Sequence, residues 1–348
     1  MDTILHLQGN VNSDLTPLWL VHPISGLALP YLALGELSRD CERPVYGINS
    51  PIYAKSSWRI PETLDDLALE YVRLLREHVQ PQGPYLLGGW SMGGMIAMRM
   101  AAVLEAQDER VIHVILIDAM NPEKVLPFQT SQEHNDMVNL TYNRLVKGVK
   151  TPTRPSLRTF QSDSSCDSDI APPFRPQLNN YDSFSSVSDG SSIDSLSSSS
   201  SRWSSQTDLR RLAKAQQERV SDDLPDENYF DDSVNSTEEC TPFEMFERMY
   251  QHISDGLSMI SENHSGARLS SVSAPVTLFK CAVLEKMPNT VSLYRRQAVQ
   301  RTFDDPKCGW DLPRLKLMLL HCAHDRMFDP EHVPGLSGAL RGLLEYCG

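Results

Sequence analysis

The sequence lacks several features that would place it in well-known classes of protein. It has no run of 18 apolar residues, no basic N-terminal segment followed by an apolar one, and no Cys-X-X-Cys pair. We therefore expect neither a transmembrane helix nor a secretory signal, and its seven scattered cysteines are typical of free thiols in a reduced, cytoplasmic protein. A net charge of −13 argues against binding to nucleic acid or to an anionic membrane, because both require a basic surface.

The composition changes twice along the chain of 348 residues. Residues 17–128 are dense in apolar runs and glycine, and the chain again has the composition of a folded protein from about residue 241. Between them, residues 151–235 are rich in serine and acidic residues. Such a segment has too few aliphatic side chains to offset the loss of chain entropy on folding, so we predict a disordered insertion.

Short apolar runs alternate with amphipathic segments in both folded parts. The predicted strands are 17–21, 44–48, 85–89, 111–119, 275–283 and 314–322. The predicted helices are 27–40, 61–79, 92–107, 131–149, 241–260 and 330–347. This alternation predicts an α/β fold with a mostly parallel central sheet and helices on both of its faces. The insertion interrupts this domain after its fourth strand.

One serine stands between pairs of glycines where a predicted strand meets a predicted helix, in the pentapeptide Gly89-Trp90-Ser91-Met92-Gly93. This pattern predicts a nucleophile elbow, which is a turn so sharp that the serine hydroxyl projects clear of the sheet. The helix beginning beneath it favours developing negative charge. The alternative is a glycine-rich turn with an incidental serine, but strand, turn and helix occur in the order that the elbow requires.

A serine nucleophile needs a base, and the base needs an acid to orient it. Asp118 lies at the end of the predicted strand that comes after Ser91. Both residues thus lie at carboxyl ends of strands in a parallel sheet and can reach the same crevice, so we predict that Asp118 is the acid. Glu285, after the next strand, remains the rival. As the base we predict His324, which lies just past the last strand.

Two other histidines are close to His324 in sequence. His321 lies within the apolar strand and is predicted to be a buried core residue, whereas His332 begins the last helix, where a solvated position is expected. The order serine, aspartate, histidine is that of α/β-hydrolases. For the oxyanion hole we predict the backbone N–H groups of Met92 and of Ile24 in the loop "HPISG".

Taken together, "WLVHPISG", "PVYGINSP", "GPYLLGGWSMGGMIAMRMAAVL", "VILIDAMNP" and the H-x-x-M segment at 324–327 resemble a known family. It comprises the thioesterase domains of polyketide synthases, nonribosomal peptide synthetases and animal fatty acid synthase. The resemblance covers 15–128 and 275–346. It implies an α/β-hydrolase core at 1–128 and 266–348 with a helical lid region at 129–265. It also implies that the acid follows the strand after the nucleophile, which supports Asp118.

The resemblance implies a thioesterase that releases a polyketide, peptide or fatty acyl chain from the phosphopantetheine of a carrier protein. The release would pass through an acyl-serine intermediate and end in hydrolysis or cyclisation. An acyl or peptidyl carrier protein is then the expected partner. The basic stretch 293–301 is a candidate docking surface for it, and the alternative is that this stretch is simply a solvated helix face. No metal cluster or nucleotide loop is visible in the sequence, so no cofactor is expected. Two alternatives stay open: a carboxylesterase or lipase, and an inactive hydrolase scaffold whose serine-rich tract binds partners.

Overall fold

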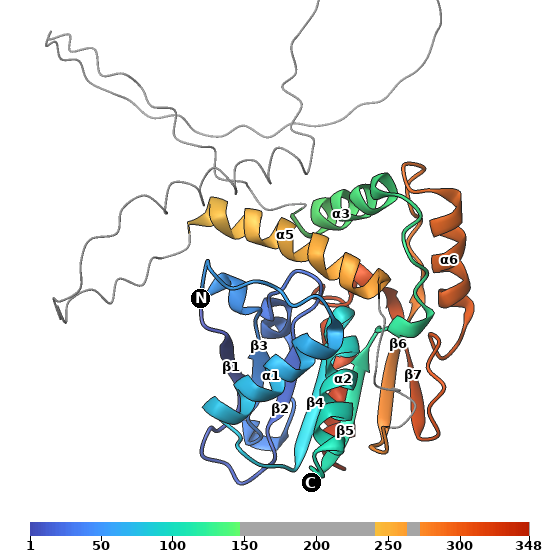
Figure 1. Ribbon diagram of the computed structural model, residues 1–348. Helices are drawn as coiled ribbons and strands as arrows, with labels where there is room; N and C mark the ends of the chain where they lie inside the picture. Colours follow the sequence, from blue (N-terminus) through green and yellow to red (C-terminus); the bar gives the residue numbers. More distant parts are fainter. Residues whose placement is uncertain (147–240, 263–271, 348) are drawn as a thin grey trace, which may run out of the picture. The chain divides into compact units, whose positions relative to one another are not determined.

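The computed structural model describes residues 1–146, 241–262 and 272–347, all of which belong to one compact unit. A seven-stranded sheet in the order β1-β3-β2-β4-β5-β6-β7 forms its centre (Figure 1). Its strands are β1 Ile4–Gln8, β2 Leu18–Val21, β3 Val45–Ile48, β4 Tyr85–Trp90, β5 Val111–Ile117, β6 Val276–Val283 and β7 Leu315–Ala323. All neighbouring strands are parallel except β1, which pairs antiparallel with β3. The predicted mostly parallel sheet is confirmed.

Helices cover both faces of this sheet. The α-helices of the described residues are α1 Leu64–His78, α2 Met92–Ala106, α3 Ser131–Val146, α5 Pro242–Ser261, α6 Leu293–Asp304 and α7 Val333–Leu344. One hydrophobic core joins the sheet to α1 and α2, and a second core joins its other face to α7. Because β2, β3 and β4 are buried along their whole length, the sequence there reads as apolar runs rather than as an alternating pattern.

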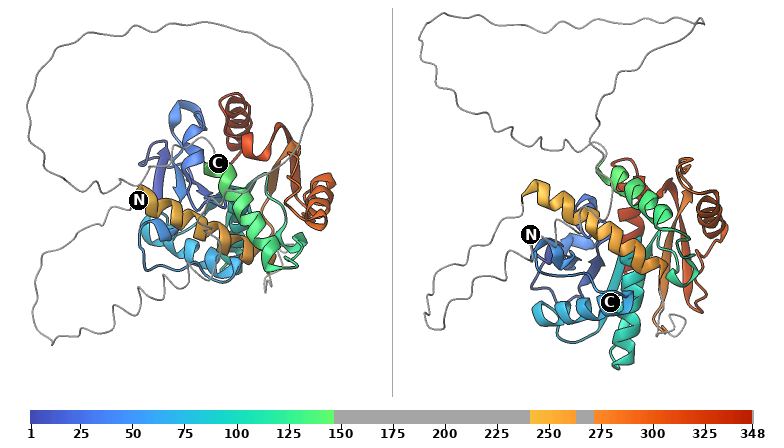
Figure 2. Two further views of the ribbon diagram at one scale, coloured as in Figure 1. Left: turned by 90° about the horizontal axis from the view of Figure 1, so that it is seen from above. Right: turned by 45° about the horizontal axis from the view of Figure 1, so that its top comes forward.

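Two helices from the predicted lid region, α3 and α5, pack against each other and lie over one end of the sheet (Figures 1 and 2). The ring of His134 on α3 is within hydrogen-bond distance of the carbonyl oxygen of Ser254 on α5, at 3.0 Å. Helix α5 begins with a capping box, in which Thr241 and Glu244 bond each other's backbone N–H groups. This cap defines where α5 starts.

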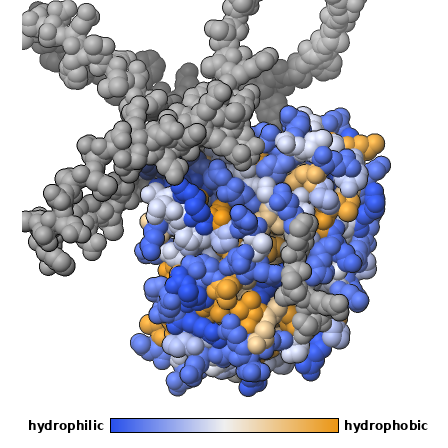
Figure 3. Space-filling model, in the orientation of Figure 1, coloured by the Kyte–Doolittle hydropathy of each residue, from blue (hydrophilic) through white to orange (hydrophobic). Residues whose placement is uncertain are grey.

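The surface is mostly hydrophilic on the face that carries α1 (Figure 3). No helix in the described part of the chain is both long and apolar enough to cross a membrane. The predicted disorder of 151–235 lies outside the described residues, and the limits 1–128, 129–265 and 266–348 remain predictions.

Some local predictions were wrong. Residues 27–40 form no α-helix: the 3₁₀ helix η1, Leu29–Ala33, is followed by extended chain that sends Leu34 and Leu37 into the core. Strand β1 was missed because it lies at the edge of the sheet and is only partly buried, so its sequence lacks the continuous apolar run of a buried strand. His321 is exposed rather than buried, since β7 is the last strand of the sheet and has a neighbour on one side only.

Candidate active site

The turn between β4 and α2 holds Ser91 in a conformation that side chains rarely adopt, with φ 57° and ψ −123°. Glycines make this turn possible because the backbones meet there. A Cβ atom on Gly89 would lie 2.3 Å from the backbone carbon of Gly93, and one on Gly93 would lie 2.1 Å from the carbonyl oxygen of Val21. Ser91 itself is partly exposed at the head of a buried helix. The predicted elbow geometry is therefore present.

Ser91 and Asp118 occupy equivalent positions on adjacent strands. Trp90 pairs with Ile117 in the parallel register of β4 and β5, and the N–H of Ser91 donates to the carbonyl oxygen of Ile117 at 2.9 Å. Asp118 has a positive φ of 44°, so the chain turns sharply at both residues. The predicted nucleophile and acid thus lie at the same edge of the sheet.

Asp118 is bonded to His324, from the 3₁₀ helix η6, His324–Arg326, that follows β7. Its Oδ2 accepts a hydrogen bond from Nδ1 of His324 at 2.6 Å, and its Oδ1 accepts one from the backbone N–H of Cys281 at 2.8 Å. Since an ionised carboxylate only accepts, Nδ1 carries the proton and Nε2 of the neutral ring is left as a proton acceptor. This is the tautomer that a general base requires.

The electrostatics of the pair agree with this assignment. Burial raises the pKa of Asp118, but the hydrogen bond and charge of His324 outweigh burial, so that this pKa lies below its ordinary value. Burial also lowers the pKa of His324, but its bond to the Asp118 carboxylate raises the pKa above the ordinary 6.5. The carboxylate therefore stays charged at neutral pH and favours a proton on the imidazole.

The residues considered as alternatives to Asp118 and His324 contact other side chains. Glu285 lies 3.7 Å from Arg144 on α3, which also forms an ion pair at 2.9 Å with Asp325, the residue after His324. His332 lies 3.3 Å from Glu331. Arg144 was not singled out from the sequence, because only the fold brings it beside a loop that is 181 residues away along the chain.

The two predicted oxyanion-hole residues lie next to each other under α5. A Cβ atom on Gly256 of α5 would lie 2.7 Å from Cδ1 of Ile24 and 3.1 Å from Sδ of Met92. Met92 is the first residue of α2, where backbone N–H groups have no acceptor within the helix. The ring of Trp90 lies 5.2 Å from that of His324 and completes the apolar surroundings.

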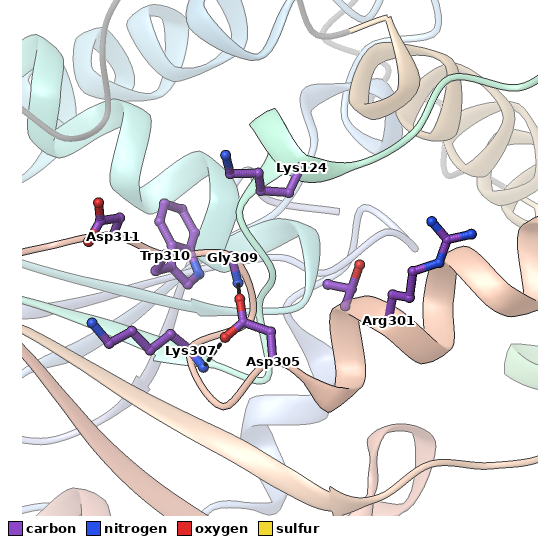
Figure 4. Close-up of a pocket in the computed structure, with 8 residues that line it drawn as sticks. Lys124, Arg301, Asp305, Lys307, Gly309, Trp310 and Asp311 are labelled. Carbon is purple, nitrogen blue, oxygen red and sulfur yellow. Dashed lines mark hydrogen bonds between the residues drawn. The ribbon is translucent and has the colours of Figure 1, made fainter.

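A surface hollow of about 400 Å³ lies beside the strand that carries the acid. Its lining includes the exposed cations Lys124, Arg301 and Lys307 (Figure 4). The indole N–H of Trp310, in the same lining, donates to the carbonyl oxygen of Ala119 at 2.8 Å, directly after Asp118. Among residues 1–146, 241–262 and 272–347, no three His, Cys, Asp or Glu side chains are grouped to hold a metal ion.

Part of the basic stretch 293–301 is unavailable for docking. Arg295 is buried and forms an ion pair at 3.2 Å with Glu133 of α3, and it also donates to the carbonyl oxygens of Leu126 and Pro127. This arginine therefore ties α6 to the region around α3. Arg295 is thus neither open to a partner nor solvated, and docking by the rest of 293–301 stays a prediction.

Comparisons with known proteins show similarity to thioesterases. A model of the thioesterase domain family matches residues 16–213. The chain is 34% identical to thioesterase pytI of Aspergillus terreus, with 99% of both chains covered. It is also 35% identical to a dimodular nonribosomal peptide synthase of Bacillus subtilis, over 39% of this chain and 6% of that one.

A solved structure shares the fold. The NocB thioesterase domain, in covalent complex with a fluorophosphonate nocardicin G analog, superposes with a TM-score of 0.53 at 20% identity, covering 98% of this chain and 99% of that one. The resemblance expected from the sequence motifs is thus confirmed by the family model, a full-length relative and the fold. The protein belongs to the thioesterase domain family, and it is an α/β-hydrolase-fold thioesterase.

Proposed function

We propose that the protein releases an acyl chain from a carrier-bound phosphopantetheine thioester through an acyl-serine intermediate. The Asp118–His324 hydrogen bond at 2.6 Å, beside the strained turn of Ser91, is the observation that carries this proposal. A serine alone is a weak nucleophile, and an oriented imidazole activates it. No resident cofactor is needed for this chemistry, and the pantetheine arm arrives with the substrate.

In the first step, Nε2 of His324 takes the proton of the Ser91 hydroxyl while Oγ attacks the thioester carbonyl carbon. The negative charge that develops on the carbonyl oxygen is held by the N–H groups of Met92 and Ile24. The C–S bond then breaks, and the imidazolium returns its proton to the departing thiolate. Asp118 stabilises the imidazolium in between.

The second step frees the acyl chain. A water molecule, or a hydroxyl or amine of the chain itself, gives its proton to His324 and attacks the ester carbon of the acyl-serine. The Ser91–acyl bond breaks, and Oγ regains a proton from the imidazolium. The product is an acid with water and a lactone or lactam with an internal nucleophile.

A fluorophosphonate probe followed by intact mass tests the nucleophile without any choice of substrate. We expect one adduct on the wild-type protein and none on Ser91→Ala or His324→Ala. A panel of acyl-pantetheine thioesters and oxygen esters then compares kcat/KM. Preference for oxygen esters would favour the carboxylesterase alternative, and a folded wild type without any adduct would favour an inactive scaffold.

We propose that the carrier protein docks on the surface hollow lined by Lys124, Arg301 and Lys307. The lining also holds two carboxylates: Asp305, which is bonded to the backbone N–H groups of Lys307 and Gly309, and the exposed Asp311 (Figure 4). Three cations against two anions leave the hollow with a net positive charge. The relatives include a nonribosomal peptide synthase, and carrier domains of such enzymes are acidic. Opposite charges favour their encounter.

Charge reversal tests this surface. Lys124→Glu combined with Arg301→Glu is expected to raise KM for a carrier-loaded substrate at least tenfold and to leave KM for a small acyl-pantetheine unchanged. The control is Arg110→Glu, an exposed position just before β5 and hence at the opposite end of that strand. Equal KM values for the carrier-loaded substrate with the double variant and the control would contradict the assignment.

A further inference from the structure

The buried histidine of α5, His252, contacts the loop that carries one of the two predicted oxyanion-hole donors. Its side chain is fully buried, and its Nδ1 lies 2.9 Å from the carbonyl oxygen of Ile24, 228 residues away along the chain. Because a carbonyl oxygen only accepts, Nδ1 carries the proton and donates. Burial lowers the pKa of His252 to about 4, so the ring is neutral at physiological pH.

Nothing else in the described part of the chain accounts for a polar ring at this position. The other ring nitrogen of His252, Nε2, is buried there without a hydrogen-bond partner. An unpaired buried nitrogen costs free energy that an apolar side chain of similar size would avoid. The bond to Ile24 is therefore the polar interaction that His252 makes and an apolar residue would not.

His252 is one of three side chains that hold consecutive carbonyl groups of this loop. Nδ1 of His22 lies 2.7 Å from the oxygen of Pro23, and the hydroxyl of Tyr53 donates to the oxygen of Ser25 at 2.5 Å. Between these two, His252 holds the oxygen of Ile24. Each C=O is coplanar with the following N–H and points the opposite way in a trans peptide. The Ile24 N–H therefore belongs to the peptide whose oxygen His22 holds, and His252 holds the peptide that follows, so the backbone of Ile24 is restrained on both sides.

The packing around His252 adds to this constraint. Its ring meets the ring of His22 edge to face, with centroids 4.9 Å apart. Gly26 turns the loop with φ +77°, and a Cβ atom there would lie 2.7 Å from the His252 ring. One turn along α5, Gly256 lies against both Ile24 and Met92. The loop, the helix and the two oxyanion-hole residues therefore form one packed unit.

We propose that His252 is a positioning residue through which α5 anchors the peptide that follows Ile24, so that Ile24, whose N–H lies in the peptide held by His22, keeps its place in the oxyanion hole only while α5 is seated on the loop. The inference rests on the proposed acyl-serine mechanism. In this proposal, helix α5 of the predicted lid region affects the rate of the chemical step and not only the entry of substrate. A loss of the bond should therefore act on kcat more than on KM.

The test compares three variants by kcat, KM and melting temperature. His252→Leu removes the donor at similar volume, and His252→Asn restores an amide N–H near the position of Nδ1. We expect His252→Leu to lower kcat ten- to hundredfold with KM within threefold, and His252→Asn to recover most of the loss. His134→Leu is the matched control, because it breaks the contact between α3 and α5 without touching the loop.

The same variants are compared by their rate of labelling with the fluorophosphonate probe, whose phosphoryl oxygen also needs the oxyanion hole. This readout works even if no thioester of the panel is turned over, which separates failure of the proposed function from failure of this inference. A folded His252→Leu with wild-type kcat and labelling rate would overturn the proposal. Equal losses in His252→Leu and His134→Leu, or a folded His252→Asn without recovery, would overturn it as well.

Discussion

Replacement of Asp118 by asparagine separates the charge of this residue from its shape. The carboxylate accepts two hydrogen bonds, one from Nδ1 of His324 and one from the backbone N–H of Cys281. Asparagine has one accepting oxygen, so only one of these two donors keeps its acceptor. The other donor then faces an NH₂ group.

The two orientations of the amide differ in what they lose. If its oxygen stays on the Cys281 N–H, the NH₂ group faces Nδ1 and forces the proton of His324 onto Nε2, which is then unable to accept the serine proton. If the amide flips, the buried N–H of Cys281 loses its acceptor, at a cost of about 1–3 kcal/mol. The first orientation is therefore favoured, and catalysis falls by about 10⁴, as expected when a triad histidine is held in the wrong tautomer.

The assay is kcat on an acyl-pantetheine thioester, with the melting temperature as a check on folding. The matched control is Glu285→Gln, which removes a carboxylate at the rival position and breaks only a partly exposed contact with Arg144. We expect the control to stay within about threefold of wild type, as a pair worth under about 1 kcal/mol should. A folded Asp118→Asn that retains a tenth of wild-type kcat would refute the reasoning, as would equal losses in both variants.

Three further predictions concern other parts of the chain. Arg144 lowers the pKa of His324 and Asp325 raises it. Because the base acts only when it is neutral, Arg144→Ala should move the acidic limb of kcat/KM to higher pH and Asp325→Asn should move it to lower pH; shifts of the same sign would contradict this. Gly93→Ala places a Cβ atom 2.1 Å from a β2 carbonyl oxygen and should abolish folding or activity, which thermal unfolding and probe labelling would show. Deletion of 155–235 should leave a folded and active enzyme, because the described lid helices lie outside it; a folded deletion variant without turnover would refute this.

Most of the fold followed from local patterns in the sequence. Buried parallel strands and amphipathic helices differ in length and periodicity, and strong glycine turns separate them. The helix predicted at 27–40 was wrong because the apolar residues of this segment belong to a 3₁₀ turn and a loop that pack into the core, and do not form one face of a helix. The exposure of His321 was not predicted either. It depends on β7 being the edge strand of the sheet, and the sequence of one segment does not determine the order of the strands.

Part of the candidate site could likewise be predicted from local sequence, and part could not. The turn at Ser91 was predictable because such an elbow needs glycines at fixed spacing, and the contact between Asp118 and His324 followed from their positions at or just beyond strand ends. The contacts of His252 and Arg144 were not predicted, because nothing near these residues in the sequence signals them. Each acquires its contact from a loop about 180 to 230 residues away.

The amino-acid sequence by itself determined the order of strands and helices, the strained turn at Ser91 and the residue types available for acyl transfer, since these depend on neighbours within a few positions. Only the tertiary structure decided that Asp118 rather than Glu285 holds His324, and that α5 reaches the loop of Ile24. Both depend on which strand ends and helices become neighbours once the sheet is assembled. That choice is made by burying the two hydrophobic cores together, through contacts between residues far apart in the chain.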